Sequence, residues 1–314
     1  TRGQNQSTEG INVMVRHQLP RAANGWNTHG LTQKQCDAYY MKDGKNCPGK
    51  DSEYIDYPAY AKRIDPNPRA EGFVTDENKD QYPELGNNRV GVSMQYVGRE
   101  PRFYASVAYN GSTWYLLNEP NDANKDKQIF YYRGGGNGYT NTMFWLRTGI
   151  GVMKFVHPDD TNRDEKEEYI RKKAEPAIRY AEILLIYAEA LCQSSRGSMD
   201  KAIAQVDIVR ARVGMKGLAE CNPDKNLQSN KDAFIEELLR ERACELGMED
   251  ARFFDLIRYK RADIFEKQLH GLFIYRLDDN GVRRDLPWRG NDEGKMAYPT
   301  HFEYEKFELN NPTR

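Results

Sequence analysis

Helical periodicity in this chain of 314 residues is confined to one stretch, which begins near residue 165 and stops near residue 270. Within it, residues 179–191 read RYAEILLIYAEAL, and apolar side chains recur at the three- and four-residue spacing of a helix face. The run carries Arg179, Glu182 and Glu189 and is shorter than the roughly 20 apolar residues that a membrane-crossing helix needs. The sequence therefore predicts a packed helix and excludes a membrane span.

Three further helices are predicted, at 200–213, 231–247 and 250–268. Gly214 directly follows the first of them and suits a helix C-cap. Small alanines beside the apolar stripe of 179–191 would let a neighbouring helix approach closely. The predicted stripe comprises Tyr180, Ile183, Leu184, Tyr187 and Leu191, with Ala181, Leu185 and Ala188 beside it.

The four predicted helices form two plausible pairs. The first pair is 179–191 with 200–213, and the second is 231–247 with 250–268. Helix–turn–helix units of about 34 residues with alanine-lined seams are typical of tetratricopeptide arrays. Such arrays usually need at least three repeats, because one unit cannot bury its apolar face alone. We therefore expect something else to cover an apolar face of the two pairs.

Residues 1–160 lack helical periodicity and are divided by turn signals such as Asn110-Gly111. Between the turns, residues 90–97 alternate in polarity, and residues 103–117 predict two strands joined by the Asn-Gly turn. The glycine-rich run at 133–138 has neither the spacing nor the following helix of a phosphate loop, so we interpret it as a flexible loop.

Beyond residue 270, residues 273–288 predict another hairpin. The predicted fold class is mainly α with long irregular loops and short β-hairpins. In it, tetratricopeptide-like helical pairs pack against an aromatic-rich, loop-dominated region. We expect the loop-rich region, residues 1–160, and the helical region, residues 161–314, to form one domain.

The charge balance excludes some partners. The formal net charge is −1, which gives no reason to expect nucleic acid or an anionic membrane surface as a partner.

The five cysteines contain no CxxC pair that would indicate a metal site. Cys36 and Cys47 are either thiols or a local disulfide, worth on the order of 3 kcal/mol in an oxidising compartment. Cys192 and Cys244 lie on predicted helices and are expected to pack as small apolar residues.

No catalytic motif is found, since the chain contains neither GxSxG nor HExxH. The acidic pairs Asp159/Asp160 and Asp278/Asp279 fall in predicted turns, where carboxylates commonly bond to the backbone. Residues 157–168 lack the central glycine of a calcium loop. The sequence therefore gives no indication of catalysis, and we expect neither a metal nor a cofactor. The histidines are interpreted as ordinary surface or core residues: His17, His29, His157, His270 and His301.

Aromatic side chains in loops are the best candidates for a binding site. A Trp or Tyr face stacks on the apolar C–H face of a pyranose, while nearby polar groups bond its hydroxyls. Trp114 and Trp145 lie in strand-like stretches and are expected in the core. The loop NGWNTHG at 24–30 presents one tryptophan among polar residues. The candidate ligand-binding residues are Trp26, Tyr54, Tyr57, Tyr60 and Tyr82.

Six segments carry a resemblance to a known family. They are LTQKQCDAYYMKDGK (31–45), REPRFYASVAYNGSTW (99–114), TGIGVMKFV (148–156), RYAEILLIYAEAL (179–191), AIAQVDIVRARVG (202–214) and LLRERACELGMEDARFFDLIRYKR (238–261). Together, and in this order, they resemble the SusD/RagB family over about residues 24–268.

The resemblance implies a surface-exposed lipoprotein of the Gram-negative outer membrane that serves nutrient uptake. Members of this family lie as a lid over a SusC-type TonB-dependent transporter and capture oligosaccharides or polysaccharides; they are binders and not enzymes. Members are longer and carry an N-terminal lipid anchor and further tetratricopeptide helices. The resemblance therefore implies that the N-terminal part of the family fold, with its anchor, is absent from this chain.

Three alternatives stay open. The same scaffold could capture peptides or another non-sugar nutrient, for which a polar cleft is expected. A tetratricopeptide scaffold that binds only protein partners would present a bare helical groove, and the aromatic-rich first half argues against it. A glycan-degrading enzyme would need two carboxylates facing a cleft, and the sequence offers no specific pair.

Overall fold

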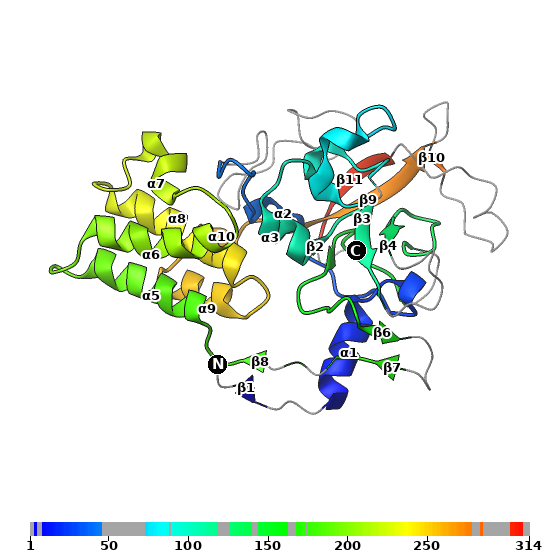
Figure 1. Ribbon diagram of the computed structural model, residues 1–314, viewed down its shortest axis with the longest axis horizontal. Helices are drawn as coiled ribbons and strands as arrows, with labels where there is room; N and C mark the ends of the chain where they lie inside the picture. Colours follow the sequence, from blue (N-terminus) through cyan, green and yellow to red (C-terminus); the bar gives the residue numbers. More distant parts are fainter. Residues whose placement is uncertain are drawn as a thin grey trace.

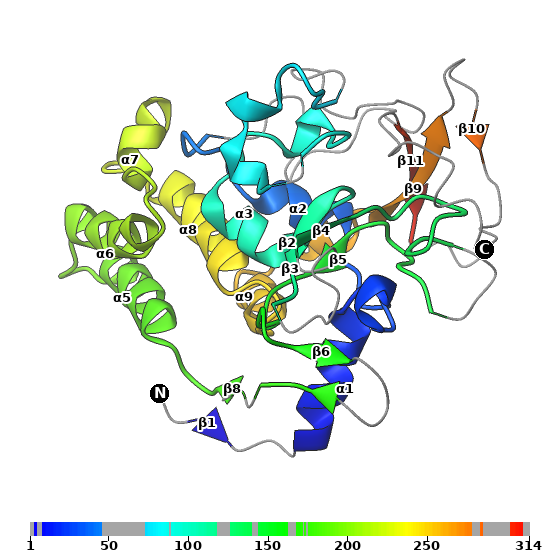
Figure 2. The same cartoon turned by 45° about the vertical axis from the view of Figure 1, so that its right-hand side comes forward.

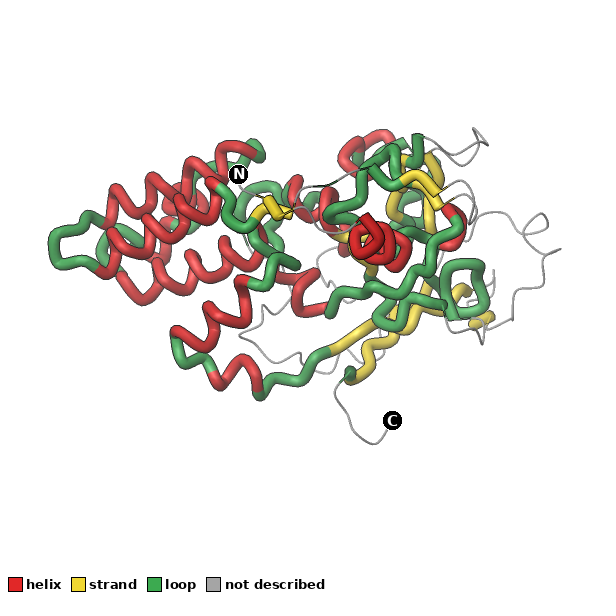
Figure 3. The backbone as a smooth tube through the Cα atoms, turned by 90° about the horizontal axis from the view of Figure 1, so that it is seen from below, coloured by secondary structure: helices red, strands yellow, loops and turns green. Residues whose placement is uncertain are grey.

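The computed structural model describes residues 3–4, 8–45, 73–87, 89–117, 126–139, 144–162, 168–171, 173, 175–277, 283–284 and 302–309. Figure 1 shows two regions side by side, with the long helices of the second half of the chain at one end and short strands, short helices and loops at the other. Figure 3, seen from below, shows the same separation of helices in red from most strands in yellow. The predicted fold class is confirmed.

The helical region confirms three of the predicted helices, α5 (Tyr180–Gln193), α6 (Met199–Arg212) and α8 (Lys231–Glu245). Ser198 and Asn230 cap the last two, since their side chains accept hydrogen bonds from Lys201 N and Ala233 N. Gly214, with a φ of 73°, follows α6 as predicted. Among the described helices, none is long and apolar enough to cross a membrane.

The predicted helix at 250–268 is wrong as a single element, because it is divided into α9 (Ala251–Arg258) and α10 (Ala262–Phe265). The division falls at Lys260, whose φ of 54° lies in the left-handed region and cannot continue a right-handed helix. Lys260 N and Arg261 N each donate over 2.9 Å to backbone carbonyls of α9 and so close its last turn. A further short helix, α7 (Leu218–Cys221), lies between α6 and α8.

The buried face of α5 differs from the predicted stripe. Leu184, Leu185 and Ala188 are buried against the other helices, and Ala188 is fully buried. Tyr180, Ile183 and Tyr187, which belong to the predicted stripe, are 73%, 46% and 51% exposed. The periodicity is right, but the stripe is rotated by about one residue, because the alanines admit α6 at close range and turn the larger side chains outward.

In its described residues, the loop-rich region contains α1 (Thr8–Gln18), α2 (Gln33–Ala38) and α3 (Pro101–Ser106). It also contains single turns of 3-10 helix at Arg21–Ala23, Lys79–Gln81, Pro83–Leu85 and Met94–Tyr96. The predicted strand at 90–97 is wrong, since its centre is the last of these turns. Val92 and Tyr96 are both fully buried, and their four-residue spacing fits a turn of helix as well as an alternating strand.

All strand pairs in the described residues are antiparallel. In the largest sheet, β9 (His270–Leu277) lies between β10 (Arg283–Arg284) and β11 (Phe302–Glu308), which confirms the predicted pairing within 273–288. The other pairs are β1 (Gly3–Gln4) with β8 (Glu175–Pro176), β2 (Val107–Ala108) with β5 (Gly151–Val152), β3 (Ser112–Tyr115) with β4 (Asp126–Ile129), and β6 (Thr161–Asn162) with β7 (Glu168–Tyr169).

The predicted hairpin at 103–117 is wrong. Pro101 occupies the first turn of α3, where its missing N–H costs nothing, and the helix runs through much of the expected first strand. The Asn110-Gly111 turn is present, with a Gly111 φ of 88°. It leads from β2 to β3, which pair with β5 and β4 rather than with each other.

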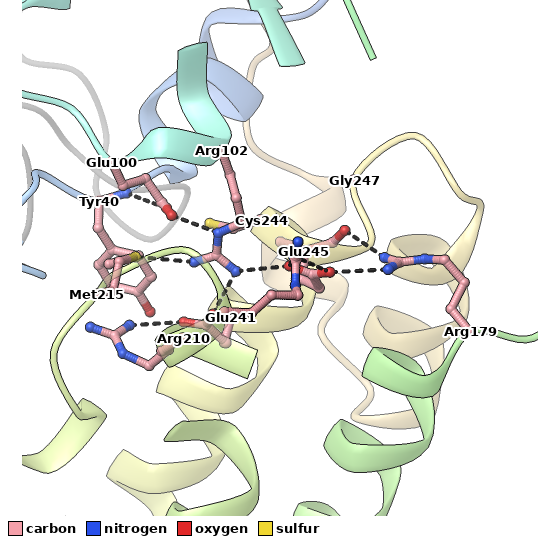
Figure 4. A network of polar contacts seen from close by, with 12 residues as sticks. Tyr40, Glu100, Arg102, Arg179, Arg210, Met215, Glu241, Cys244, Glu245 and Gly247 are labelled. Atoms are coloured by element: carbon pink, nitrogen blue, oxygen red, sulfur yellow. Dashed lines mark hydrogen bonds and ion pairs between the residues drawn. The ribbon is translucent and has the colours of Figure 1, made fainter. Parts of the chain in front are cut away.

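A buried ionic network joins α3 of the loop-rich region to α8 of the helical region (Figure 4). Arg102 donates to Glu241 over 2.6 Å and to Glu245 over 3.3 Å, and also to Glu100 over 2.6 Å. Arg210 of α6 donates to the second oxygen of Glu241 over 2.9 Å. We call this set, Glu100, Arg102, Arg210, Glu241 and Glu245, the seam network; it connects two apolar cores that lie on either side of it.

Electrostatics within the seam network keep Glu241 ionised. Burial acts to raise its pKa, but Arg102 and Arg210 outweigh burial and hold the pKa below its ordinary value. Burial dominates at Glu100 and raises the pKa of that carboxyl, although Arg102 opposes it. The carboxylate between the two guanidinium groups is therefore the fixed negative centre of the network.

The predicted packing of Cys192 and Cys244 is confirmed, since both are buried. Cys36 is also buried, on α2, while Cys47 lies outside the described residues. The choice between thiols and a disulfide for Cys36 and Cys47 therefore stays open.

Candidate functional site

Trp26 lies at the centre of an aromatic cluster at the end of α1. The ring of His17 meets it edge to face, with centroids 4.7 Å apart, and the ring of Phe144 stacks against it at 5.5 Å. His29 stacks on His17 at 5.0 Å. The guanidinium carbon of Arg16 lies 5.8 Å from the Trp26 ring centroid, at the outer limit of a cation–π contact. We call these five residues the Trp26 cluster.

The loop at 24–30 is held in place by backbone bonds to α1 (Figure 2 shows α1 in blue). Trp26 N donates to Arg16 O over 2.7 Å, and the amides of Thr28 and His29 both donate to His17 O, over 2.8 and 3.0 Å. These bonds use carbonyls that a helix end leaves without an intrahelical partner. The loop is thereby fixed against the helix, which gives the Trp26 ring a defined orientation.

Gly25 is required for this close approach. A Cβ atom at this position would lie 2.0 Å from the carbonyl oxygen of Leu19, which no side chain could accept. Asn24 and Asn27 flank it with φ angles of 55° and 49°, in the left-handed region that asparagine tolerates. Asn27 Nδ2 donates to Asn137 O over 2.6 Å and so ties the loop to the segment that precedes Phe144.

Both histidines of the Trp26 cluster have a pKa below the ordinary value of about 6.5, so their neutral form predominates at pH 7. Burial lowers the pKa of His17, and burial together with neighbouring His17 lowers the pKa of His29. His17 Nδ1 forms a hydrogen bond with the Thr28 hydroxyl. A neutral imidazole carries one donor and one acceptor nitrogen, which suits hydroxyl groups on a ligand. No group of residues in the described part of the chain has the composition of a metal site.

A second group of rings follows directly along the chain. Trp145 meets Tyr139 edge to face at 4.9 Å, and Arg133 lies over Tyr139 at 4.7 Å and over Phe273 at 5.1 Å. The core prediction for Trp114 is confirmed, with 2% exposure, but that for Trp145 is wrong because it is only half-buried. This residue belongs to an aromatic surface next to Phe144 instead.

Of the other predicted site residues, only Tyr82 lies in the described part of the chain, and it is not part of the Trp26 cluster. Tyr82 is half-buried between two 3-10 turns and packs against the loop-rich core. Its segment, cyan in Figures 1 and 2, lies at the top of the molecule, whereas α1 lies at the bottom. Tyr54, Tyr57 and Tyr60 lie outside the described residues, so their role stays a prediction.

Sequence reasoning missed His17, His29, Phe144 and Trp145. The interpretation of the two histidines as ordinary residues overlooked that His29 lies in the same short loop as Trp26. Nothing in the sequence indicated that Phe144 would reach this loop, because the pairing spans more than a hundred residues. The aromatic pair at 144–145, in a turn-rich segment, was a usable signal for rings outside the core.

The acidic pair Asp159/Asp160 lies in a turn, which its carboxylates stabilise. Asp160 Oδ2 accepts from His157 N over 2.6 Å and from Lys173 Nζ over 2.5 Å. The carboxylate of Asp160 is fully buried. Both of its oxygens are engaged, since Oδ1 accepts from Arg171 N over 2.8 Å. This pair is thus structural.

The fold and the family resemblance agree with comparisons to known proteins. The chain belongs to the SusD family, whose model matches residues 1–304. Its fold is similar to that of a SusD-like protein from Bacteroides fragilis, at 23% identity and a TM-score of 0.55, over 91% of this chain and 42% of that chain. It is also similar to BT4246, at 19% identity and a TM-score of 0.60, over 95% of this chain and 43% of that chain.

The chain therefore spans less than half the length of these solved structures. At such identities the likeness shows the fold and not the ligand. Among curated protein sequences there is no significant match.

Proposed function

We propose that this protein is a nutrient-binding protein of the bacterial cell surface and that it captures a glycan at the Trp26 cluster. The observation that carries the proposal is a fixed, partly exposed group of aromatic rings on a SusD-family fold. Phe144 is 39% exposed and His29 is exposed, so the cluster is open to a ligand at its edge.

The chemistry of the Trp26 cluster suits a sugar. The rings of Trp26 and Phe144 offer apolar surface for the C–H face of a pyranose. The neutral imidazole of His29 and the guanidinium of Arg16 lie next to this surface and can bond hydroxyl groups. Because the loop is already held by its bonds to α1, little conformational entropy is lost when a ligand binds.

The family extends the proposal to partners and location. We propose that the protein is lipid-anchored in the outer membrane of a Gram-negative bacterium, through a segment outside this chain. There it acts as the lid of a SusC-type TonB-dependent transporter. The lack of a catalytic motif and the structural role of Asp159/Asp160 support binding without catalysis.

The experiment is a calorimetric panel of polysaccharides, oligosaccharides and mixed peptides against the protein and two matched variants. Phe144→Ala removes a ring of the Trp26 cluster that is 39% exposed, whereas the control Phe254→Ala removes a more exposed ring of α9, at 66%, far from the cluster in sequence. We expect saturable binding of one glycan that Phe144→Ala weakens about tenfold, which corresponds to the loss of about 1.4 kcal/mol of ring contact, and that Phe254→Ala leaves unchanged.

Two results would contradict the proposal. Binding of peptides with no response to any glycan would assign the scaffold to a non-sugar nutrient. Equal affinity of both variants for a glycan would place the site elsewhere, in the tyrosine segment at 54–60 or outside this chain.

A further inference from the structure

Two segments without acidic residues form the Trp26 cluster and the aromatic surface beside it. Residues 10–36 contain no Asp or Glu, and neither do residues 127–158, although acids make up 47 of the 314 residues. Both segments are therefore positively charged within a chain whose formal net charge is −1. Their cations are Arg16, Arg21, Lys34, Lys127, Arg133, Arg147 and Lys154.

The second segment holds rings and cations next to each other. Arg133 N donates to Ile274 O over 2.8 Å, and Leu272 N donates to Thr148 O over 2.9 Å, so the segment is fixed to β9 at two places. Between these places lie the contacts of Trp145 with Tyr139 and of Arg133 with Tyr139 and Phe273. We call this set the Trp145 surface: Arg133, Tyr139, Trp145, Arg147 and Phe273.

The Trp145 surface is continuous with the Trp26 cluster. Phe144 belongs to the cluster and directly precedes Trp145, and Asn27 Nδ2 donates to Asn137 O over 2.6 Å. Three residues of chain span at most about 11 Å, so the Cα atoms of Phe144 and Arg147 lie within this distance of each other. A short oligosaccharide stacked on Phe144 can therefore reach the side chain of Arg147.

Arg147 is the exposed cation of the Trp145 surface. Its guanidinium carbon lies 5.3 Å from the ring centroid of Trp145, and with the described residues it forms no ion pair. A guanidinium that stacks on a ring keeps its N–H groups at its edge, where they can bond two oxygens of a carboxylate or sulfate group. The donors of Arg147 are thus available to a ligand that also contacts the rings.

Other cations near this surface have carboxylate partners within the protein. Arg283 lies over Tyr275 at 4.1 Å but bonds to Glu303 over 2.8 Å and to Glu305 over 2.9 Å. Lys154 forms an ion pair with Glu249 over 2.5 Å. The charge of these two side chains is matched internally, whereas no described carboxylate matches that of Arg147.

We propose that the glycan captured by this protein is acidic and that Arg147 binds its negative group. This inference rests on the proposed function and names its substrate class. The negative group is a uronic acid carboxylate or a sulfate ester, since each presents at least two oxygens to the planar edge of a guanidinium. The C–H faces of the same sugars lie on the rings of the Trp26 cluster and the Trp145 surface.

The test is a calorimetric titration with two matched pairs of probes, oligogalacturonate with its methyl ester and dextran sulfate with dextran. Arg147→Gln removes the guanidinium. The control Arg196→Gln removes an exposed arginine between α5 and α6 that forms no ion pair with the described residues. We expect saturable binding of one acidic probe, weakened about tenfold or more by Arg147→Gln, as loss of a charge-assisted hydrogen bond implies, and unchanged in the control.

The two pairs also separate the two chemistries. Binding of oligogalacturonate would assign the site to a carboxylate, and binding of dextran sulfate would assign it to a sulfate ester. Salt gives an independent readout, because ions screen exposed charges. The affinity for the acidic probe should fall as sodium chloride is raised from about 50 to about 500 mM, and it should fall less in Arg147→Gln.

Four results would overturn the inference. They are silence of both acidic probes, equal affinity for an acidic probe and its neutral partner, equal affinity for inorganic polyphosphate, and full affinity in Arg147→Gln. A neutral glycan whose binding is weakened by Phe144→Ala would overturn this inference and leave the proposed function standing. Silence of every glycan would contradict both. Circular dichroism of each variant verifies that lost binding is not lost folding.

Discussion

Replacement of Glu241 by glutamine tests how strongly the seam network holds the two regions together. Glu241 is fully buried and accepts from Arg102 over 2.6 Å and from Arg210 over 2.9 Å. Glutamine has the same shape but no charge, so Arg210, also fully buried, would lose its carboxylate partner. Removal of one partner from a buried ion pair costs about 3–5 kcal/mol. This is a large share of the roughly 5–15 kcal/mol that stabilises a typical domain.

The assay is urea unfolding followed by circular dichroism at pH 7. We expect Glu241→Gln to lower the free energy of unfolding by about 3 kcal/mol or more. The control is Glu220→Gln, which breaks the exposed pair of Glu220 with Lys216, 2.9 Å apart on the surface, and should leave the midpoint unchanged. A loss below about 1 kcal/mol for Glu241→Gln would refute the reasoning, since the network would then be no stronger than a surface pair.

The same variant gives a pH test with a definite sign. Because the pKa of Glu241 is lowered in the folded protein, its contribution is fully present above the unfolded value of about 4.3. The contribution is lost as the pH falls through the folded pKa. The difference in unfolding free energy between the protein and Glu241→Gln should therefore be constant from pH 7 to pH 5 and shrink below about pH 4. A difference that grows on acidification would contradict the assignment.

Three further predictions follow from backbone geometry and burial. Gly25→Ala should displace the loop at 24–30, because its Cβ would lie 2.0 Å from Leu19 O, and it should abolish glycan binding in the calorimetric panel. Lys260→Gly relieves a left-handed residue with a φ of 54° and should raise the unfolding free energy by up to about 1 kcal/mol, measured in urea. Leu185→Ala, at a fully buried position of α5, should cost about 2–5 kcal/mol, whereas Ile183→Ala, at 46% exposure, should cost clearly less in the same assay. Equal losses for the last pair would mean that Ile183 is as well buried as Leu185, which would contradict the observed orientation of α5.

The long helices were predictable because their signal is local. Periodicity over 179–191, 200–213 and 231–247 required helices, and the observed bounds of α5, α6 and α8 agree within a few residues. Which face of α5 is buried was not predictable, since apolar residues lie on more than one side of it. The position of α6 and α8 decided the matter by covering Leu185 and Ala188 and leaving Tyr180 exposed.

Short elements were less predictable, because a few residues satisfy two periods at once. Residues 90–97 alternate like a strand but form a 3-10 turn, and Asn110-Gly111 makes a turn without making a hairpin. A two- or four-residue strand is stable only when its partner is present, so the identity of the partner determines the strand. Such partners come from distant parts of the chain, and no local rule names them.

For binding sites too, some features can be predicted from the sequence and others depend on tertiary packing. Sequence alone determined that Trp26 lies in a polar loop and that six ordered segments belong to the SusD family, because side-chain chemistry and segment order are written along the chain. Only the tertiary structure decided that Phe144 stacks on Trp26 and that Arg133 lies over Phe273. The physical reason is that a site depends on distances between side chains, and packing sets these distances after the helices and loops have formed.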